Sequence, residues 1–158
     1  MKVYFSLGSN IGDKNYYLHE ALRKMSEIPG ISNLETSEII ETEPWGFEAE
    51  ENFLNCVAKA DYYPNQAEIL LNHLKQIEKD LGRNITAQSH IEGKRVYTSR
   101  TIDIDILFYG IETIDTDILK VPHPLMSQRD FVMIPLKSIA ENEVKSAFPD
   151  IFQHRISK

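Results

Sequence analysis

The stretch SRTIDIDILFYG, residues 99–110, reads as a buried strand that two acidic residues interrupt. Side chains alternate between the two faces of a strand, so Asp103 and Asp105 share one face while Ile102, Ile104 and Ile106 share the other. The two acids lie about 6.6 Å apart along the strand, at ~3.3 Å per residue. Carboxylates this close repel each other unless they face water or share a cation. The pattern therefore indicates either the solvated face of an edge strand or a divalent-metal site on a rigid element.

A basic segment runs directly into this strand. Residues 83–100 have a local charge of +3, whereas residues 35–51 contain seven Glu and no Lys or Arg. The charged residues of the basic segment are Arg83, Glu92, Lys94, Arg95 and Arg100. A charge run is most often a solvated face, but cations beside paired carboxylates are also what a metal-bound polyphosphate needs. Residues 83–99 read as a long, polar, aperiodic loop, and such a loop inside a compact domain is usually functional or disordered.

The rest of the chain predicts strands alternating with helices. Apolar residues at helical spacing predict helices over 13–28 and 65–81, the second with an Asn65–Glu68 capping box and a Gly82 C-cap. Further predicted elements are strands at 2–9, 33–44 and 53–63, a helix at 131–142 and an irregular C-terminal strap. This order, β-α-β-β-α-β, predicts a single domain, residues 1–158, with an α+β ferredoxin-like fold whose helices cover a mainly antiparallel sheet.

Composition and charge limit the class of protein. The 158-residue chain is 42% hydrophobic and 26% charged, as is usual for a globular domain, and its net charge of −7 argues against a nucleic-acid binder. It has no run of about 20 apolar residues, and its first residues read as a strand rather than a signal peptide. The single Cys56 lies in an apolar run, which favours a buried core residue over a nucleophile. We expect a monomeric cytoplasmic protein with no membrane partner.

Other catalytic chemistries have little support in the sequence. GSNIGDK, residues 8–14, lacks the spacing of a Walker phosphate loop, and the five His residues are too scattered for a zinc site. The acidic pair remains, and two carboxylates suit Mg²⁺, which keeps several waters and accepts a substrate phosphate as a further ligand. The residues themselves therefore predict magnesium-dependent handling of a nucleotide, with the acceptor left open.

Five longer motifs are more specific. They are YFSLGSNIGD at 4–13, TEPWG followed by FLN at 42–55, QIEKDLGR at 76–83, SRTIDIDIL at 99–107 and VPHPLMSQRDF at 121–131. In this order, the motifs resemble the hydroxymethyldihydropterin pyrophosphokinase family of the folate pathway over almost the whole chain. The resemblance implies transfer of a pyrophosphoryl group from ATP to a pterin alcohol with release of AMP. It also implies two Mg²⁺ ions and a ferredoxin-like α-β-α sandwich.

The resemblance also implies roles for individual residues. Asp103 and Asp105 would bind the Mg²⁺ ions that bridge the ATP phosphates, and Asp105 would lie near the attacking hydroxyl. Arg83 and Arg100 would stabilise the transferring group. We also expect residues 83–99 to form a lid that closes only when both substrates are bound. The residues that would contact ATP are Lys75, Glu78, Arg100, Ile106, Lys120, His123 and Arg129. The residues that would contact the pterin are Thr42, Glu43, Trp45, Phe53, Asn55, Tyr97 and Phe131.

Structural interpretations of these residues stay open at this point. Thr42 and Asn55 could be ordinary turn and strand residues, His123 could stiffen a turn between two prolines, and Arg83 could complement a helix dipole. The chain also departs from the family pattern, mainly in the lid and the nucleotide contacts. The unusual residues are Trp45, Phe53, Lys75, Ile85, Tyr97 and Pro124.

Two rival functions are also considered. A nucleotidyltransferase would combine Gly8 and Ser9 with the acidic pair and would release pyrophosphate instead of AMP. In such enzymes the Gly-Ser pair lies shortly before the acids, whereas 94 residues separate Ser9 from Asp103 here. A non-catalytic binding module would have no use for an acidic pair, a cationic lid and an aromatic pocket together. Both rivals are therefore less favoured than the pyrophosphokinase.

Overall fold

The structure is a computed structural model that describes residues 1–42, 52–83 and 101–153. As the sequence predicts, a strand and a helix are followed by further strands, a second helix and the strand that carries the two acids. The strands are β1 (Lys2–Ser9), β2 (Ile31–Thr36), β3 (Ile40–Thr42), β4 (Phe53–Tyr62), β5 (Asp103–Tyr109), β6 (Ile114–Asp115) and β7 (Lys120–Val121). The helices are α1 (Lys14–Ser26), α2 (Ala67–Glu78) with η1 (Lys79–Arg83), η3 (Met126–Gln128), α4 (Asp130–Ile139), α5 (Asn142–Ala147) and α6 (Pro149–Gln153). None of the helices in the described ranges is long and apolar enough to cross a membrane.

The main sheet has the strand order β2-β4-β1-β5, and β3 also pairs with β4. All of these pairings are antiparallel. The central strand is β1, which lies between β4 and β5 and therefore positions residues of both neighbours. Among the described strands, β5 pairs only with β1 and forms one edge of the sheet. The predicted α+β fold with a mainly antiparallel sheet is confirmed.

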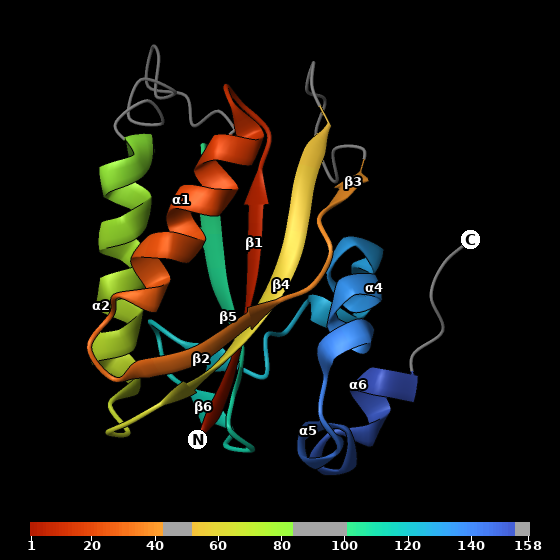
Figure 1. Ribbon diagram of the computed structural model, residues 1–158. Coiled ribbons are helices and arrows are strands. Elements are labelled where there is room, and N and C mark those ends of the chain that lie inside the picture. Colours follow the sequence, from red (N-terminus) through yellow and green to blue (C-terminus); the bar gives the residue numbers. More distant parts are fainter. Residues whose placement is uncertain (43–51, 84–100, 154–158) are drawn as a thin grey trace.

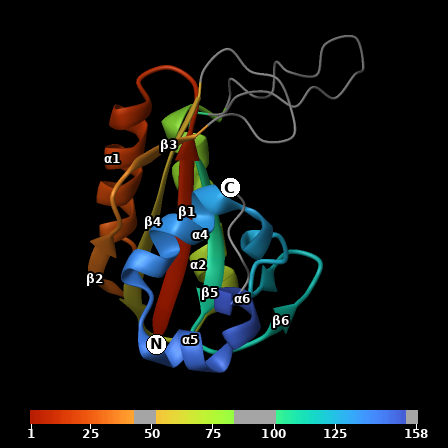
Figure 2. The same cartoon turned by 90° about the vertical axis from the view of Figure 1, so that its right-hand side faces the viewer.

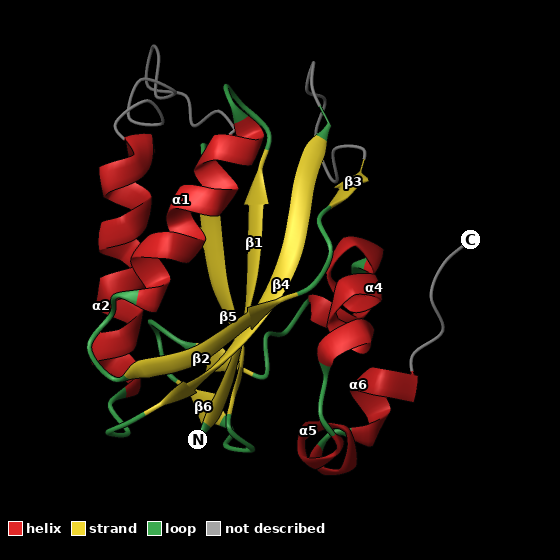
Figure 3. Ribbon diagram, in the orientation of Figure 1, coloured by secondary structure: helices red, strands yellow, loops and turns green. Residues whose placement is uncertain are grey.

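Helices cover both faces of the sheet (Figures 1 and 3). On one face, α1 and α2 bury apolar side chains such as Leu18, Met25 and Leu74 against the sheet. Cys56 belongs to this core and is 1% exposed, so the predicted core role is confirmed. Burial raises the pKa of its thiol to about 12, which leaves it protonated and unreactive near neutral pH.

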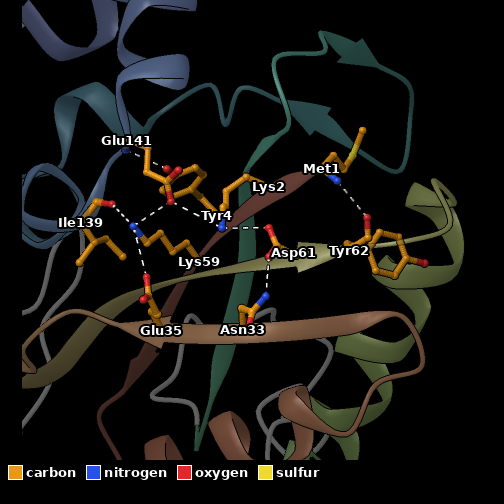
Figure 4. Close-up of polar contacts among 10 residues, drawn as sticks. All are labelled: Met1, Lys2, Tyr4, Asn33, Glu35, Lys59, Asp61, Tyr62, Ile139 and Glu141. Carbon is orange, nitrogen blue, oxygen red and sulfur yellow. Dashed lines mark hydrogen bonds and ion pairs between the residues drawn. The ribbon is translucent and has the colours of Figure 1, made fainter.

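The opposite face carries α4, with α5 and α6 beside it (Figure 2). Lys59 of β4 fixes the end of α4 to the sheet (Figure 4). Its Nζ donates to the carbonyl of Ile139 at 2.9 Å. The same ammonium lies 3.0 Å from the carboxylate of Glu141 and 3.3 Å from that of Glu35. The Glu141 amide donates to the hydroxyl of Tyr4 at 2.9 Å. These contacts hold α4 on the sheet, and its other end carries the predicted site residue Phe131.

Three local predictions are wrong. In the described part of the predicted strand at 33–44, which ends at Thr42, the chain forms the end of β2 and the separate strand β3. The two are divided because Ser37 turns its side chain into the sheet, where its Oγ accepts from the Val57 amide at 2.9 Å. The capping box is absent, since α2 begins at Ala67 and Asn65 instead donates to Glu112 at 3.2 Å. The C-terminal strap contains the helices α5 and α6, whose apolar residues pack in a second core on the α4 face of the sheet, around Phe108 and Val132.

Candidate active site

The two acids of β5 lie on one face of the strand, as predicted. Asp103 and Asp105 are half-buried, while Ile104 and Ile106 are 5% and 3% exposed and belong to the core under α1 and α2. In the sheet register, Asp103 lies opposite Gly8 and Asp105 lies opposite Ser6 of the central strand. The acids are therefore carried by a strand that is anchored on its buried side.

A register shift in β5 positions His123. Tyr4 pairs with Phe108 and Phe5 pairs with Ile106, which leaves Leu107 as an extra residue in a β-bulge. The freed carbonyl of Leu107 accepts a hydrogen bond from the His123 amide at 2.9 Å. The bulge therefore ties the proline-containing segment around His123 to the edge of the sheet, beside the two acids.

The surroundings of His123 favour the neutral form of its imidazole. Burial lowers its pKa, the positive charge of Arg129 lowers it further, and the charge of Asp103 offsets these effects in part. The His123 Nε2 atom lies 3.9 Å from Asp105 Oδ2, a distance too long for a strong ion pair, so burial outweighs this contact. The Leu125 amide donates to Nδ1 at 3.3 Å, so the proton of the neutral ring belongs on Nε2, which is directed toward the acids.

Glu78 links α2 to β5. Its side chain is 3% exposed, and its Oε2 accepts from the Ile104 amide at 2.8 Å. Because β5 is an edge strand, this outward amide has no strand partner among the described residues, and Glu78 takes that place. The hydrogen-bonded amide lies between Asp103 and Asp105, so Glu78 fixes the backbone that presents the acids.

A cavity of about 270 Å³ lies beside these groups. It is lined by residues of α2, β5 and the segment before and after β7. The lining residues are Leu71, Lys75, Glu78, Asp103, Ile104, Asp105, Ile106, Ile118, Leu119, Lys120, His123 and Pro124. Seven of the predicted metal-binding and ATP-binding residues thus meet at one cavity, although they come from three distant parts of the sequence. The Lys120 ammonium also pairs with Asp115 across the β6–β7 hairpin, at 2.5 Å.

Three of the predicted pterin residues, Thr42, Phe53 and Asn55, lie together where β3 pairs with β4. Asn55 of β4 is 5% exposed, and its Nδ2 donates to the hydroxyl of Thr42 in β3 at 2.7 Å. Phe53 lies directly opposite Thr42 in the register, and Gly8 lies opposite Asn55. The structure therefore brings Asn55, Thr42 and Phe53 together, and the central strand separates Asn55 from Asp103 by one residue.

Arg129 and Phe131 lie at the start of α4. The guanidinium of Arg129 stacks over the ring of Phe131, with its central carbon 5.6 Å from the ring centroid. Arg129 also lies close enough to His123 to lower the pKa of that residue. One end of α4 thus connects the predicted pterin side of the site to the predicted phosphate side.

Several predicted residues cannot be placed in this way. Glu43, Trp45, Tyr97 and Arg100 lie outside the described residues, together with most of the predicted lid. Arg83 ends η1, and its side chain is not described.

Sequence reasoning missed other residues of the cavity. Leu71 lies one helical turn before Lys75, so helical spacing was an available signal for it. No such signal was available for Ile118, whose place at the cavity depends on the short β6–β7 hairpin. None was available for the bulge at Leu107 either, because it depends on the register between β1 and β5.

Comparison with known proteins identifies relatives over most of the chain. Residues 4–141 match the profile of a family described as 7,8-dihydro-6-hydroxymethylpterin-pyrophosphokinase (HPPK). A 2-amino-4-hydroxy-6-hydroxymethyldihydropteridine pyrophosphokinase of Aquifex aeolicus is 41% identical over 142 residues, which cover 90% of this chain and 82% of the relative. The protein of the same name from Bacillus subtilis is 38% identical over 145 residues, 92% of this chain and 81% of the relative.

Solved structures show the same fold. A crystal structure described as HPPK-DHPS in complex with substrates aligns with a TM-score of 0.60 at 14% identity, over 94% of this chain. The wild-type HPPK-DHPS of Plasmodium falciparum aligns with a TM-score of 0.61 at the same identity and coverage. This chain spans 43% and 44% of those two longer chains. At this identity the likeness concerns the fold only.

Proposed function

The chain belongs to the 7,8-dihydro-6-hydroxymethylpterin-pyrophosphokinase family, and we propose that it transfers the pyrophosphoryl group of ATP to 6-hydroxymethyl-7,8-dihydropterin, with Mg²⁺ as cofactor. In this reaction the pterin hydroxyl loses its proton, and its oxygen forms a bond to the β-phosphorus of ATP. The bond from that phosphorus to the α–β bridging oxygen breaks, and AMP leaves. The product is a pterin diphosphate for folate biosynthesis. We also expect the protein to act as a monomer in the cytoplasm.

The observation that carries the proposal is the cavity beside β5. Three carboxylates, two ammonium groups and an imidazole meet there. They belong to Glu78, Asp103, Asp105, Lys75, Lys120 and His123. A polyphosphate with bound cations needs both signs of charge at close range, and a solvated strand face would need neither lysine nor histidine nearby. This grouping therefore supports the metal interpretation of the acidic pair over the solvated edge strand.

The acidic pair fits Mg²⁺ in its chemistry. Asp103 and Asp105 offer oxygen ligands on one face of a rigid strand, and both line the cavity. Mg²⁺ at nucleotide sites is bound through one or two carboxylates together with substrate phosphates. When bound there, Mg²⁺ would neutralise negative charge on the pyrophosphoryl group during its transfer from AMP to the pterin oxygen. The protein's contribution is to hold the acids in place, through Glu78 and the sheet register.

The remaining residues would orient the two substrates. Lys75 and Lys120 would bind phosphate oxygens, and the Nε2–H of His123 would donate a hydrogen bond without adding a full charge. Asn55 would bind the polar edge of the pterin, and Phe131 would stack on its ring. When both substrates are bound in a fixed arrangement, the entropic cost of bringing them together is met on binding and no longer adds to the barrier of the chemical step.

The nucleotidyltransferase alternative calls for a direct test. The sheet register places Gly8 opposite Asp103, so the long sequence separation does not keep the Gly-Ser pair away from the acids. Ser9, however, is fully buried, and a buried hydroxyl cannot contact a nucleotide phosphate. The two functions also release different products, since a pyrophosphokinase releases AMP and a nucleotidyltransferase releases pyrophosphate.

The experiment follows from this difference in products. The protein is incubated with ATP, Mg²⁺ and 6-hydroxymethyl-7,8-dihydropterin, and the nucleotides are separated by ion-exchange chromatography. We expect AMP to form only when both pterin and Mg²⁺ are present. Release of pyrophosphate, or AMP formation that does not depend on the pterin, would contradict the proposal.

A further inference from the structure

Gly8 occupies an unusual position in the central strand. It lies opposite Asn55 of β4 on one side and opposite Asp103 of β5 on the other, so it separates the predicted pterin residue from the predicted metal residue. A glycine inside a strand weakens the strand relative to alanine, and it often marks a position where another group approaches the backbone closely. The lack of a side chain at this position therefore calls for a local reason.

The reason is steric. A Cβ atom at Gly8 would lie 2.8 Å from Oδ1 of Asn55, closer than two such atoms can approach. Asn55 is 5% exposed, and in its present orientation its Nδ2 donates to Thr42 at 2.7 Å. It could avoid the Cβ only by leaving that orientation. The next nearest atoms, Cγ of Asn55 and the Leu54 carbonyl oxygen, are both 3.9 Å away, which is ordinary contact. An alanine here would therefore turn the amide of Asn55 and leave the backbone largely undisturbed.

Gly30 shows what a purely structural glycine looks like in the same chain. Its φ of +95° is a conformation that residues with a side chain rarely adopt, and a Cβ there would lie 2.3 Å from the backbone oxygen of Tyr63. Substitution of Gly30 would strain the backbone itself. Substitution of Gly8 would strain only one side chain, and that side chain belongs to the candidate site.

We propose that Gly8 is a positioning residue for the pterin: the absence of its side chain holds the Asn55 amide in the orientation that binds the ring. This inference rests on the proposed function, because it assigns Asn55 to the pterin. Gly8 acts through Asn55, so any effect of a side chain at position 8 depends on the presence of the Asn55 amide.

A double-mutant cycle tests this dependence. Pterin affinity is measured by calorimetry, with Mg²⁺ and a non-hydrolysable ATP analogue, for wild type, Gly8→Ala, Asn55→Ala and the double variant. Loss of one well-oriented buried hydrogen bond predicts that Gly8→Ala weakens pterin binding by roughly tenfold or more. In the Asn55→Ala background, the same substitution is expected to weaken binding by less than about threefold. An equal loss in both backgrounds would overturn the proposal.

Controls separate this proposal from its alternatives. Gly30→Ala should lower the melting temperature without weakening pterin binding by the folded protein, and Gly8→Ala should leave the affinity for the ATP analogue unchanged. If Gly8→Ala does not fold, the double variant should fold, because the clashing amide is gone; failure of both would overturn the steric argument. A wild-type protein that does not bind the pterin would overturn the proposed function, and the role of Gly8 with it.

Discussion

Removal of the Glu78 carboxylate should loosen the strand that carries the acidic pair. Glu78 is 3% exposed and its carboxylate accepts from the Ile104 amide at 2.8 Å, so Glu78→Ala leaves a buried amide without this partner. A hydrogen bond to a charged group contributes about 1.5–3 kcal/mol. For a domain of this size, a loss of about 2 kcal/mol lowers the melting temperature by about 4–8 °C.

The comparison with Glu78→Gln isolates the hydrogen bond. A glutamine oxygen can still accept from the Ile104 amide, so this variant should lose clearly less stability than Glu78→Ala. Glu68→Gln, on the exposed first turn of the same helix, is the matched control for removal of a charge and should stay within about 0.5 kcal/mol of wild type.

The assay is thermal unfolding followed by circular dichroism, combined with a Mg²⁺ titration of turnover for each folded variant. We expect Glu78→Ala to need more Mg²⁺ for half-maximal activity than Glu78→Gln does, because its acids are less well held. Equal melting temperatures for the two variants would refute the reasoning, since the loss would then not arise from the bond to Ile104.

Three further outcomes are expected. Asp105→Ala should lower turnover by roughly a hundredfold or more while the melting temperature stays near that of wild type, because the side chain is 39% exposed; near-normal turnover in the folded variant would exclude a metal role. Asn55→Ala should weaken pterin binding by roughly ten- to a hundredfold and leave ATP binding almost unchanged; equal losses in calorimetry for both ligands would show that Asn55 is misassigned. The hydrogen bond from Lys59 lowers the pKa of Glu141, so its stabilisation is complete above the carboxyl's ordinary pKa of 4.5 and is lost as pH falls through the lowered value. The melting temperatures of wild type and Glu141→Gln should therefore differ most near neutral pH and converge in acid; a difference that grows in acid would contradict this.

The fold could be predicted from local patterns because these patterns agree with the final packing. The alternation from Ile102 to Ile106 separates a core face from an acidic face, and the structure shows that separation. Predictions from residue spacing were wrong where a side chain forms a hydrogen bond with a residue of another element. Asn65 binds Glu112, 47 residues away, instead of capping α2, and Ser37 enters the sheet and divides a predicted strand.

The site could be predicted only as a set of residues, and its geometry could not. Motif resemblance pointed to Lys75, Asp105 and His123, but their meeting depends on strand register and on the bulge at Leu107. A bulge inside an apolar run leaves no trace in residue types, because every residue around it is equally hydrophobic. The role of Gly8 was hidden for a related reason, since it depends on which residue lies opposite in the neighbouring strand.

The most direct test of the central claim follows both transferred phosphates at once. In ³¹P NMR of a reaction containing ATP, Mg²⁺ and 6-hydroxymethyl-7,8-dihydropterin, the three ATP signals should be replaced by the single resonance of AMP and two coupled resonances of a pterin diphosphate. Such a spectrum requires the β- and γ-phosphates to move together. Signals of ADP with a pterin monophosphate, or of free pyrophosphate with a pterin–AMP adduct, would contradict pyrophosphoryl transfer.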